Sequence, residues 1–216
     1  MRFADRADAG RRLAQKLTGY RDRDPLVLAL PRGGLPVAAE IAEALGAPLD
    51  VVLARKIGVP GQPELAMGAA VDGDPPIVVR NEAVIRAARV DAATFEAARR
   101  RALAEVEAAS RRLVGVRPRV EVAGRAVILV DDGVATGATA RAALQALRQR
   151  RPTTLTFAAP VASAEAAAAL RPLVDQLICL ETPTRFAAVS AFYVEFGQVE
   201  DDEAAAILDR FRPSTA

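Results

Sequence analysis

Asp131 and Asp132 are the most chemically specific residues of this chain, because two adjacent acids directly follow the apolar run Val127–Val130. A β-branched run of this kind predicts a strand that is buried on both faces. The two acids would then lie at the carboxyl end of that strand. Carboxylates repel anions, so we expect the pair to face sugar hydroxyls or a divalent cation.

The residues that follow the acids form a loop of small and hydroxyl-bearing side chains. Gly133 and Gly137 permit a tight backbone, and Thr136 and Thr139 offer hydroxyl donors. Helix formers follow at 140–150, so the loop leads into a helix N-terminus, where backbone N–H groups converge on an anion. Acids and loop together predict a site for a phosphorylated sugar. The alternative is a generic turn between strand and helix that is rich in Gly and Thr.

The whole thirteen-residue block VILVDDGVATGAT resembles the ribose-phosphate signature of type I phosphoribosyltransferases, which use phosphoribosyl pyrophosphate (PRPP). The resemblance implies that Asp131 and Asp132 bind the ribose 2′- and 3′-hydroxyls. It also implies Mg²⁺, held mainly by substrate oxygens and water, with the same two acids as candidate protein ligands. The residues that it assigns to the 5′-phosphate are Gly133, Val134, Ala135, Thr136, Gly137, Ala138 and Thr139.

Ala135 separates the subfamilies of this group. Hypoxanthine-guanine members carry an acid at the position of Ala135, so a 6-oxopurine mechanism of that kind is disfavoured. Adenine-type members have Ala there and take a carboxylate from a mobile loop, which makes Glu64 a candidate general base. A solvent-exposed loop glutamate without a catalytic role is an equally good interpretation of Glu64.

A second phosphate-type turn follows the apolar run Leu26–Leu30, in the segment LPRGGLPVAAEIA. Gly33 and Gly34 can expose N–H groups to an anion, and Arg32 adds a guanidinium with a bidentate donor fork. The resemblance assigns these three residues to the pyrophosphate loop and implies a non-proline cis peptide near Arg32. A plain Gly-Gly turn is the alternative interpretation.

Arg55 and Lys56 directly follow another predicted strand, Leu49–Leu53. Consecutive cations at the carboxyl end of a strand are suited to anion binding. The segment ARKIGVPGQPEL resembles the corresponding loop of adenine and orotate phosphoribosyltransferases, which implies that both cations contact pyrophosphate and assist catalysis. The lysine of the adenine-specific pattern is missing from residues 59–63, so a purine acceptor is not secured. We expect this loop to close over the substrate and exclude water.

Aromatic side chains are concentrated in the irregular stretch ETPTRFAAVSAFYVEFGQ, residues 181–198. Rings there could stack on a planar base, and Arg185 could meet an anionic substituent. The resemblance implies a base-binding hood in this region, with Arg185, Phe186 and Phe192 as candidates beside Tyr193 and Phe196. Ordinary packing of a C-terminal flap explains the aromatic residues equally well.

Alternation of apolar strands with helices predicts an α/β fold, a doubly wound parallel sheet flanked by helices, as in type I phosphoribosyltransferases. Ligands of such sheets bind at the carboxyl ends of the strands, near a switch in strand order. We expect one domain over 1–216, with a flexible loop and hairpin over 55–80 and a small hood with a C-terminal helix over 181–216. The expected helices are 4–17, 35–45, 81–113 with a break at 90–91, 138–150, 163–170 and 201–211, and the expected strands are 26–30, 49–53, 77–79, 127–130, 154–159 and 176–180.

Composition removes several classes of function. Histidine is absent, which excludes Ser-His-Asp and Cys-His hydrolases and HExxH zinc enzymes. The single cysteine, Cys179, rules out an intrachain disulfide and lies in an apolar run that predicts a buried structural thiol. The net charge of +2 and an aromatic content of 4% give little support for nucleic-acid binding. No apolar run is long enough to span a membrane, and the N-terminus lacks a secretory h-region.

The resemblance therefore implies an enzyme that transfers 5-phosphoribose from PRPP to a nucleobase or related nitrogen acceptor and releases pyrophosphate. We expect it to be a cytoplasmic homodimer that binds neither nucleic acid nor membrane. The alternative is a regulatory protein on the same fold, which binds PRPP or a nucleotide without catalysis.

Overall fold

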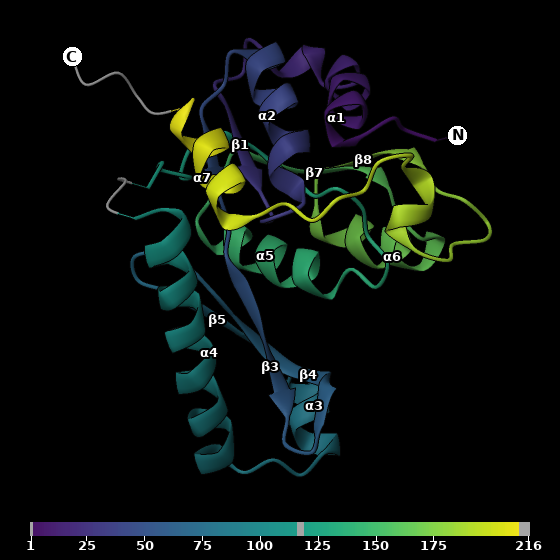
Figure 1. Cartoon of the computed structure of the whole chain (residues 1–216). Coiled ribbons are helices and arrows are strands. Elements are labelled where there is room, and N and C mark those ends of the chain that lie inside the picture. Colours follow the sequence, from purple (N-terminus) through teal and green to yellow (C-terminus); the bar gives the residue numbers. More distant parts are fainter. Residues whose placement is uncertain (1, 116–118, 212–216) are drawn as a thin grey trace.

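The computed structural model describes residues 2–115 and 119–211, with Glu64 described by its backbone alone. Within these residues a five-stranded parallel sheet has the strand order β2-β1-β6-β7-β8, which confirms the predicted fold class (Figure 1). The order reverses between β1 and β6, so the carboxyl ends of these two strands flank a switch point. The strands are β1 (Pro25–Ala29), β2 (Leu49–Val51), β6 (Ala126–Val130), β7 (Thr154–Val161) and β8 (Gln176–Glu181).

Helices cover both faces of this sheet (Figure 1). On one face lie α1 (Arg6–Gln15), α2 (Gly34–Leu45) and α7 (Asp201–Asp209), and on the other lie α5 (Ala138–Gln149) and α6 (Ala164–Leu170). Every residue of β1 and of β6 is buried, because both of their faces are covered. Short 3₁₀ turns complete the chain at Thr18–Tyr20, Arg171–Leu173 and Val189–Phe192.

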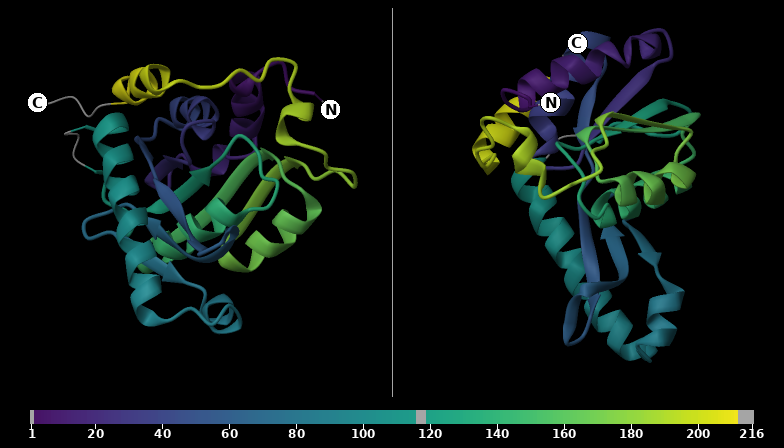
Figure 2. Two further views of the ribbon diagram at one scale, coloured as in Figure 1. Left: turned by 60° about the horizontal axis from the view of Figure 1, so that its bottom comes forward. Right: turned by 90° about the vertical axis from the view of Figure 1, so that its right-hand side faces the viewer.

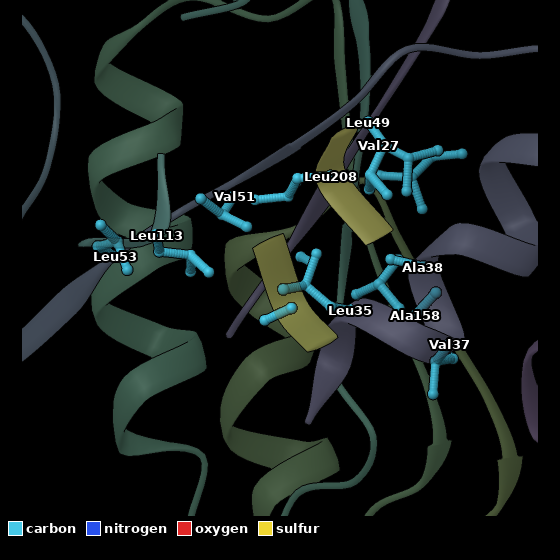
Figure 3. Packing of buried hydrophobic residues seen from close by; sticks show 14 of the residues in the cluster. Val27, Leu35, Val37, Ala38, Leu49, Val51, Leu53, Leu113, Ala158 and Leu208 are labelled. Atoms are coloured by element: carbon cyan, nitrogen blue, oxygen red, sulfur yellow. The ribbon is translucent and has the colours of Figure 1, made fainter. Parts of the chain in front are cut away.

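The C-terminal helix α7 completes the core on its side of the sheet. Its Leu208 is 1% exposed and belongs to the same hydrophobic cluster as Leu35 and Ala38 of α2 and Val27 of β1 (Figure 3). Burial of one leucine side chain contributes roughly 2 kcal/mol. The helix is therefore fixed beside the loop that joins β1 to α2.

The region 55–80, where we expected a flexible loop and hairpin, forms a three-stranded sheet: the expected strand at 77–79 is present, and most of the expected loop is strand as well. The strands β3 (Ala54–Val59), β4 (Gln62–Val71) and β5 (Ile77–Arg80) form an antiparallel sheet in sequence order. Glycine and proline obscured the strand pattern, because Gly58 lies at a bulge and Gly61 makes the β3-β4 turn at a φ of +78°. Packing on both faces stabilises strands that have weak local propensity.

Helices on either side provide that packing (Figure 2). The long helix α4 (Ala92–Leu113) lies against one face and α5 against the other, while α3 (Glu82–Ala87) follows β5. The predicted break between α3 and α4 is confirmed, because the Asp91 carboxylate caps α4 by accepting a hydrogen bond from the Thr94 N–H at 2.7 Å. The small sheet is thus held between two helices rather than exposed as a loop.

The stretch from Thr182 to Val199 is irregular apart from its 3₁₀ turn, as predicted. The N-terminal segment pairs with it: Phe3 forms a parallel bridge with Tyr193, and the Val194 N–H donates to the Phe3 carbonyl at 2.8 Å. None of the helices that the structure describes is long and apolar enough to cross a membrane.

Candidate functional site

Two loops touch at the switch point between β1 and β6. The Leu30 N–H donates to the Val130 carbonyl at 2.8 Å, which extends the pairing of the two strands to their ends. Beyond this bond Gly33 lies so close to Asp132 that an added methyl group would overlap the carboxylate, and a Cβ on Gly34 would lie 2.8 Å from the Val130 carbonyl oxygen. Glycine is required at both positions by this close approach.

The loop after the acids is tied to the end of β7. The Val134 N–H donates to the Val161 carbonyl at 2.9 Å, and the Ser163 hydroxyl donates to the Ala135 carbonyl at 2.7 Å. Gly137 adopts a φ of +75° and begins α5 as its N-cap. Among the described residues the N–H groups of 135–139 have no acceptor, so they are available to an anion at this helix N-terminus.

The two acids differ in their surroundings. Burial and the neighbouring charge of Asp132 raise the pKa of Asp131 well above its usual value. Burial also raises the pKa of Asp132, but the Arg6 guanidinium acts in the opposite direction. The Asp132 N–H donates to the Asp131 carboxylate at 2.9 Å, so the backbone fixes the Asp131 side chain.

Arg6 is a site residue that the sequence did not reveal. Its Nε lies 2.8 Å from Asp132 Oδ2, and its Nη1 donates to the Gly197 carbonyl at 2.6 Å. The guanidinium also lies 3.9 Å from the centre of the Phe196 ring, in a cation–π contact. No local pattern marks Arg6, because it stands in the first turn of a helix 126 residues away from its partner.

Tyr193 joins the irregular C-terminal stretch to the acids. Its hydroxyl donates to the Asp132 carbonyl oxygen at 2.5 Å, and its ring lies 5.4 Å from that of Phe3 and 4.9 Å from that of Phe196. Burial, and after it the charge of Asp132, raise the pKa of Tyr193, which keeps the hydroxyl protonated as a donor. The hood therefore fixes the backbone at Asp132 through the Tyr193 hydroxyl.

The segment after β1 matches only part of the expected pyrophosphate loop. The Pro31–Arg32 peptide is cis, as the resemblance implies. The Gly34 N–H, however, already donates to the Leu30 carbonyl at 3.1 Å, which removes it as an anion ligand. Arg32 Nη1 lies 3.3 Å from Asp201 and 3.6 Å from Glu200, so two acids at the start of α7 face this cation.

Arg55 and Lys56 diverge, because both lie on β3 and successive side chains of a strand point to opposite faces. Arg55 lines a pocket of 290 Å³ together with Arg32 and Arg112. Lys56 instead lines a groove of 490 Å³ that also contains Thr136 and Thr139. The structure brings only one of the two cations to the side of Arg32.

A third pocket, of 420 Å³, contains the acid that Arg6 binds. It is lined by side chains or backbone of Arg6, Arg32, Gly33, Asp132, Phe196, Gly197, Gln198 and Val199. The loop after β1, Asp132 and the end of the hood thus share one cavity.

The hood candidates lie differently from this cavity. Phe186 and Phe192 stack on each other with ring centres 5.7 Å apart, and Arg185 is exposed. None of the three lines the 420 Å³ pocket, where Phe196 is the aromatic residue. The side chain of Glu64, the candidate base, lies outside the described part of the structure, and its backbone belongs to β4.

Comparison with known proteins agrees with this geometry. A family model described as "Phosphoribosyl transferase domain" matches residues 3–196. Rv0571c and MT0597 of two Mycobacterium tuberculosis strains, named as candidate phosphoribosyl transferases, are each 45% identical over 208 residues, which is 96% of this chain. The chain spans 46% of the length of these curated relatives. The crystal structure of TT1426 from Thermus thermophilus superimposes with a TM-score of 0.89 at 42% identity, covering 99% of this chain and 100% of that one.

Proposed function

Because the chain belongs to the type I phosphoribosyltransferase family, we propose that it transfers 5-phosphoribose from PRPP to a nucleobase or related nitrogen acceptor and releases pyrophosphate. The observation that carries this proposal is the contact between Gly33 and Asp132 at the switch point. The contact brings the loop that would hold pyrophosphate against the acid that would hold ribose. Transfer requires this proximity, because the bond that breaks joins pyrophosphate to the C1 carbon of the ribose.

The donor would bind across this contact. The N–H groups of 135–139 and the hydroxyls of Thr136 and Thr139 would bind the 5′-phosphate, while Asp131 and Asp132 would accept hydrogen bonds from the ribose hydroxyls. Ribose hydroxyls suit these acids, whose pKa values are raised by burial. Such neutral donors replace hydrogen bonds that the buried carboxylates have lost to water, and they add no negative charge.

Departure of pyrophosphate builds up negative charge that the site must stabilise. Arg32 and Arg55 line one pocket and are suited to this role, together with the N–H of Gly33. Arg32 would exchange its contacts with Glu200 and Asp201 for the phosphate oxygens. We place Lys56 at the same substrate from the other side of β3, near the 5′-phosphate loop.

The residues present are compatible with Mg²⁺ as cofactor. No group of three or more His, Cys, Asp or Glu side chains within 2–115 and 119–211 forms a metal cage. Mg²⁺ needs no such cage, since it retains water and substrate oxygens and uses one or two carboxylates. Asp131 is the better placed protein ligand, because Arg6 already binds Asp132. When bound, the ion would neutralise charge on the diphosphate.

The acceptor would enter through the 420 Å³ pocket. Phe196 and Val199 offer apolar contact, and Arg6 and Arg32 offer positive charge at the same pocket. The more distant Phe186 and Phe192 would then act only if the hood moved. Glu64 remains a candidate base, and a homodimer remains part of the proposal.

Pyrophosphate release from PRPP, measured with Mg²⁺ and a panel of purines, pyrimidines and carboxylated nitrogen heterocycles, tests the function. We expect turnover with at least one acceptor. Calorimetry should show PRPP binding that Asp131→Asn with Asp132→Asn abolishes, whereas Asp22→Asn, at an exposed position, leaves it unchanged.

Two different failures can be separated. PRPP binding without turnover for any acceptor would favour the regulatory alternative. PRPP binding that survives replacement of both acids would contradict the site assignment itself.

A further inference from the structure

The 490 Å³ groove between α5 and the sheet β3-β4-β5 is lined in large part by residues to which the proposed reaction gives no role. Thr136, Ala138 and Thr139 form one end of it, at the 5′-phosphate loop. From there it continues along α5 past Arg141 to Gln145. Its volume is within the roughly 300–1,000 Å³ of small-molecule sites.

Small side chains contribute to the lining of the groove from both α5 and the sheet. Because such side chains project little into the groove, they leave room for a planar ring. These small lining residues are Ala54, Ala66, Gly68, Ala69, Ala138 and Ala142.

The charged residues that line the groove are mainly positive. Lys56, Arg80 and Arg141 line it, against Glu82 as the carboxylate among the described lining residues. Arg80 lies 2.7 Å from Glu82, whereas Arg141 is exposed and makes no ion pair with a carboxylate that the structure describes. The side-chain amides of Asn81 and Gln145 add donors and acceptors for the edges of a ring. This lining suits an anionic ligand that also carries a flat polar ring.

The groove and Asp132 lie on different sides of the 5′-phosphate loop. Asp132 lines the 420 Å³ pocket and not the groove, whereas Thr136 and Thr139 line the groove. A phosphate on this loop would therefore have its ribose toward the acids and a remaining oxygen toward the groove. A substituent on that oxygen would run along α5 between helix and sheet.

We propose that the groove binds the nucleoside half of a ligand whose ribose 5′-phosphate is itself esterified, as in a nucleoside diphosphate-linked ribose. The inference rests on the proposed function, because it uses the same phosphate loop and the same two acids. It adds a second subsite, in which Arg141 meets the distal phosphate and the small lining residues receive the base.

Calorimetry with ribose 5-phosphate and with ADP-ribose tests the proposal on the intact chain. We expect ADP-ribose to bind about tenfold more tightly, since it adds charge-assisted hydrogen bonds and ring contacts. Arg141→Gln should reduce this advantage about fivefold, and Ala66→Leu, which adds a larger side chain to the lining of the groove from β4, should remove it. Neither variant should change the affinity for ribose 5-phosphate. Arg100→Gln, at an exposed arginine of α4 outside the groove, is the matched control.

Each possible result either supports or contradicts the inference. Equal affinities for the two ligands, or an ADP-ribose advantage that survives both groove variants, would overturn the inference and leave the proposed function intact. If the wild-type protein did not bind ribose 5-phosphate, both the inference and the proposed function would be contradicted. Arg141→Gln tests the idea independently of folding, because its exposed position can accept glutamine, while circular dichroism checks that Ala66→Leu is folded.

Discussion

The Nε atom of Arg6 lies 2.8 Å from Oδ2 of Asp132, in an ion pair whose side chains are only 12% and 14% exposed. The pair links the first helix to the acid that we assign to ribose. It opposes the effect of burial on the carboxylate, which would otherwise favour the protonated acid. Arg6 is thus a positioning residue for Asp132, and it holds the end of the hood through Gly197 at the same time.

Replacement of Arg6 by glutamine should raise the pKa of Asp132 further, because a nearby cation is lost. Ribose hydroxyls need the ionised carboxylate as acceptor, so binding of ribose 5-phosphate should require a higher pH. We expect the pH profile of affinity to move upward and the free energy of unfolding to fall by about 2 kcal/mol. Arg11→Gln, on the same helix and with a 57% exposed side chain, is the control. An unchanged pH profile would contradict the role of Arg6.

Gly33→Ala should disrupt the contact between the two loops. The added methyl group would overlap the Asp132 carboxylate, and overpacking of this kind costs about 1–3 kcal/mol. We expect a lower unfolding midpoint in urea and a loss of PRPP affinity. Gly19→Ala is a matched control, since an added Cβ there meets nothing within 4 Å. If both variants had the same unfolding midpoint and the same PRPP affinity, the prediction that the close approach at Gly33 matters for stability and binding would be contradicted.

Asp131→Asn should stabilise the unliganded protein at neutral pH. The folded-state pKa of Asp131 is raised above its usual value of 3.8 by burial and by the charge of Asp132. Below the unfolded-state pKa the group is neutral in both states and the two proteins should be equally stable. As the pH rises through the raised folded-state pKa, the free energy of unfolding of the wild type falls, because the folded protein must bury a charge that asparagine lacks. Unfolding midpoints between pH 3 and pH 8 measure this difference, and a variant less stable at pH 7 would contradict it.

Arg119 should be required for the junction between the two sheets. Its Nη2 lies 2.5 Å from Asp72 Oδ2, and its Nε lies 3.5 Å from Asp50 Oδ2. Both acids are buried. Arg119→Met would remove the cation that faces both acids, leaving Asp72 only the charge of Arg150, and should cost about 3 kcal/mol. Adding Asp72→Asn to Arg119→Met should restore part of the loss, because one uncompensated charge is removed. Chemical denaturation of the single and double variants gives the coupling, and additive effects would argue against it.

Cys179 should react slowly with thiol reagents in the folded protein. Burial on β8 raises the pKa of its thiol to about 11, so little thiolate exists at pH 8. We expect modification by a disulfide reagent at pH 8 to be much slower than in urea-unfolded protein. Equal rates in the two states would show that this part of β8 opens easily.

Local patterns in the sequence were sufficient for most of the parallel sheet. Runs such as Val127–Val130 have no polar position, and only a strand covered on both faces accommodates them. The Asp91 cap and the turn after β6 could also be predicted, because the residues that determine them are neighbours in the chain. The strands β3 and β4 could not, since their glycine, alanine and proline residues form strands only between α4 and α5.

The sequence by itself was sufficient to predict the acid pair and the loop that we assign to phosphate, because these predictions depend on residue types at fixed short spacing. Tertiary structure decided what surrounds them. It brought Arg6 to Asp132 and Tyr193 to the backbone behind it, and it sent Arg55 and Lys56 to opposite faces of one strand. It also formed the groove beside α5 from elements that are remote in sequence. The physical reason is that such contacts depend on how helices and sheets pack, which no local spacing encodes.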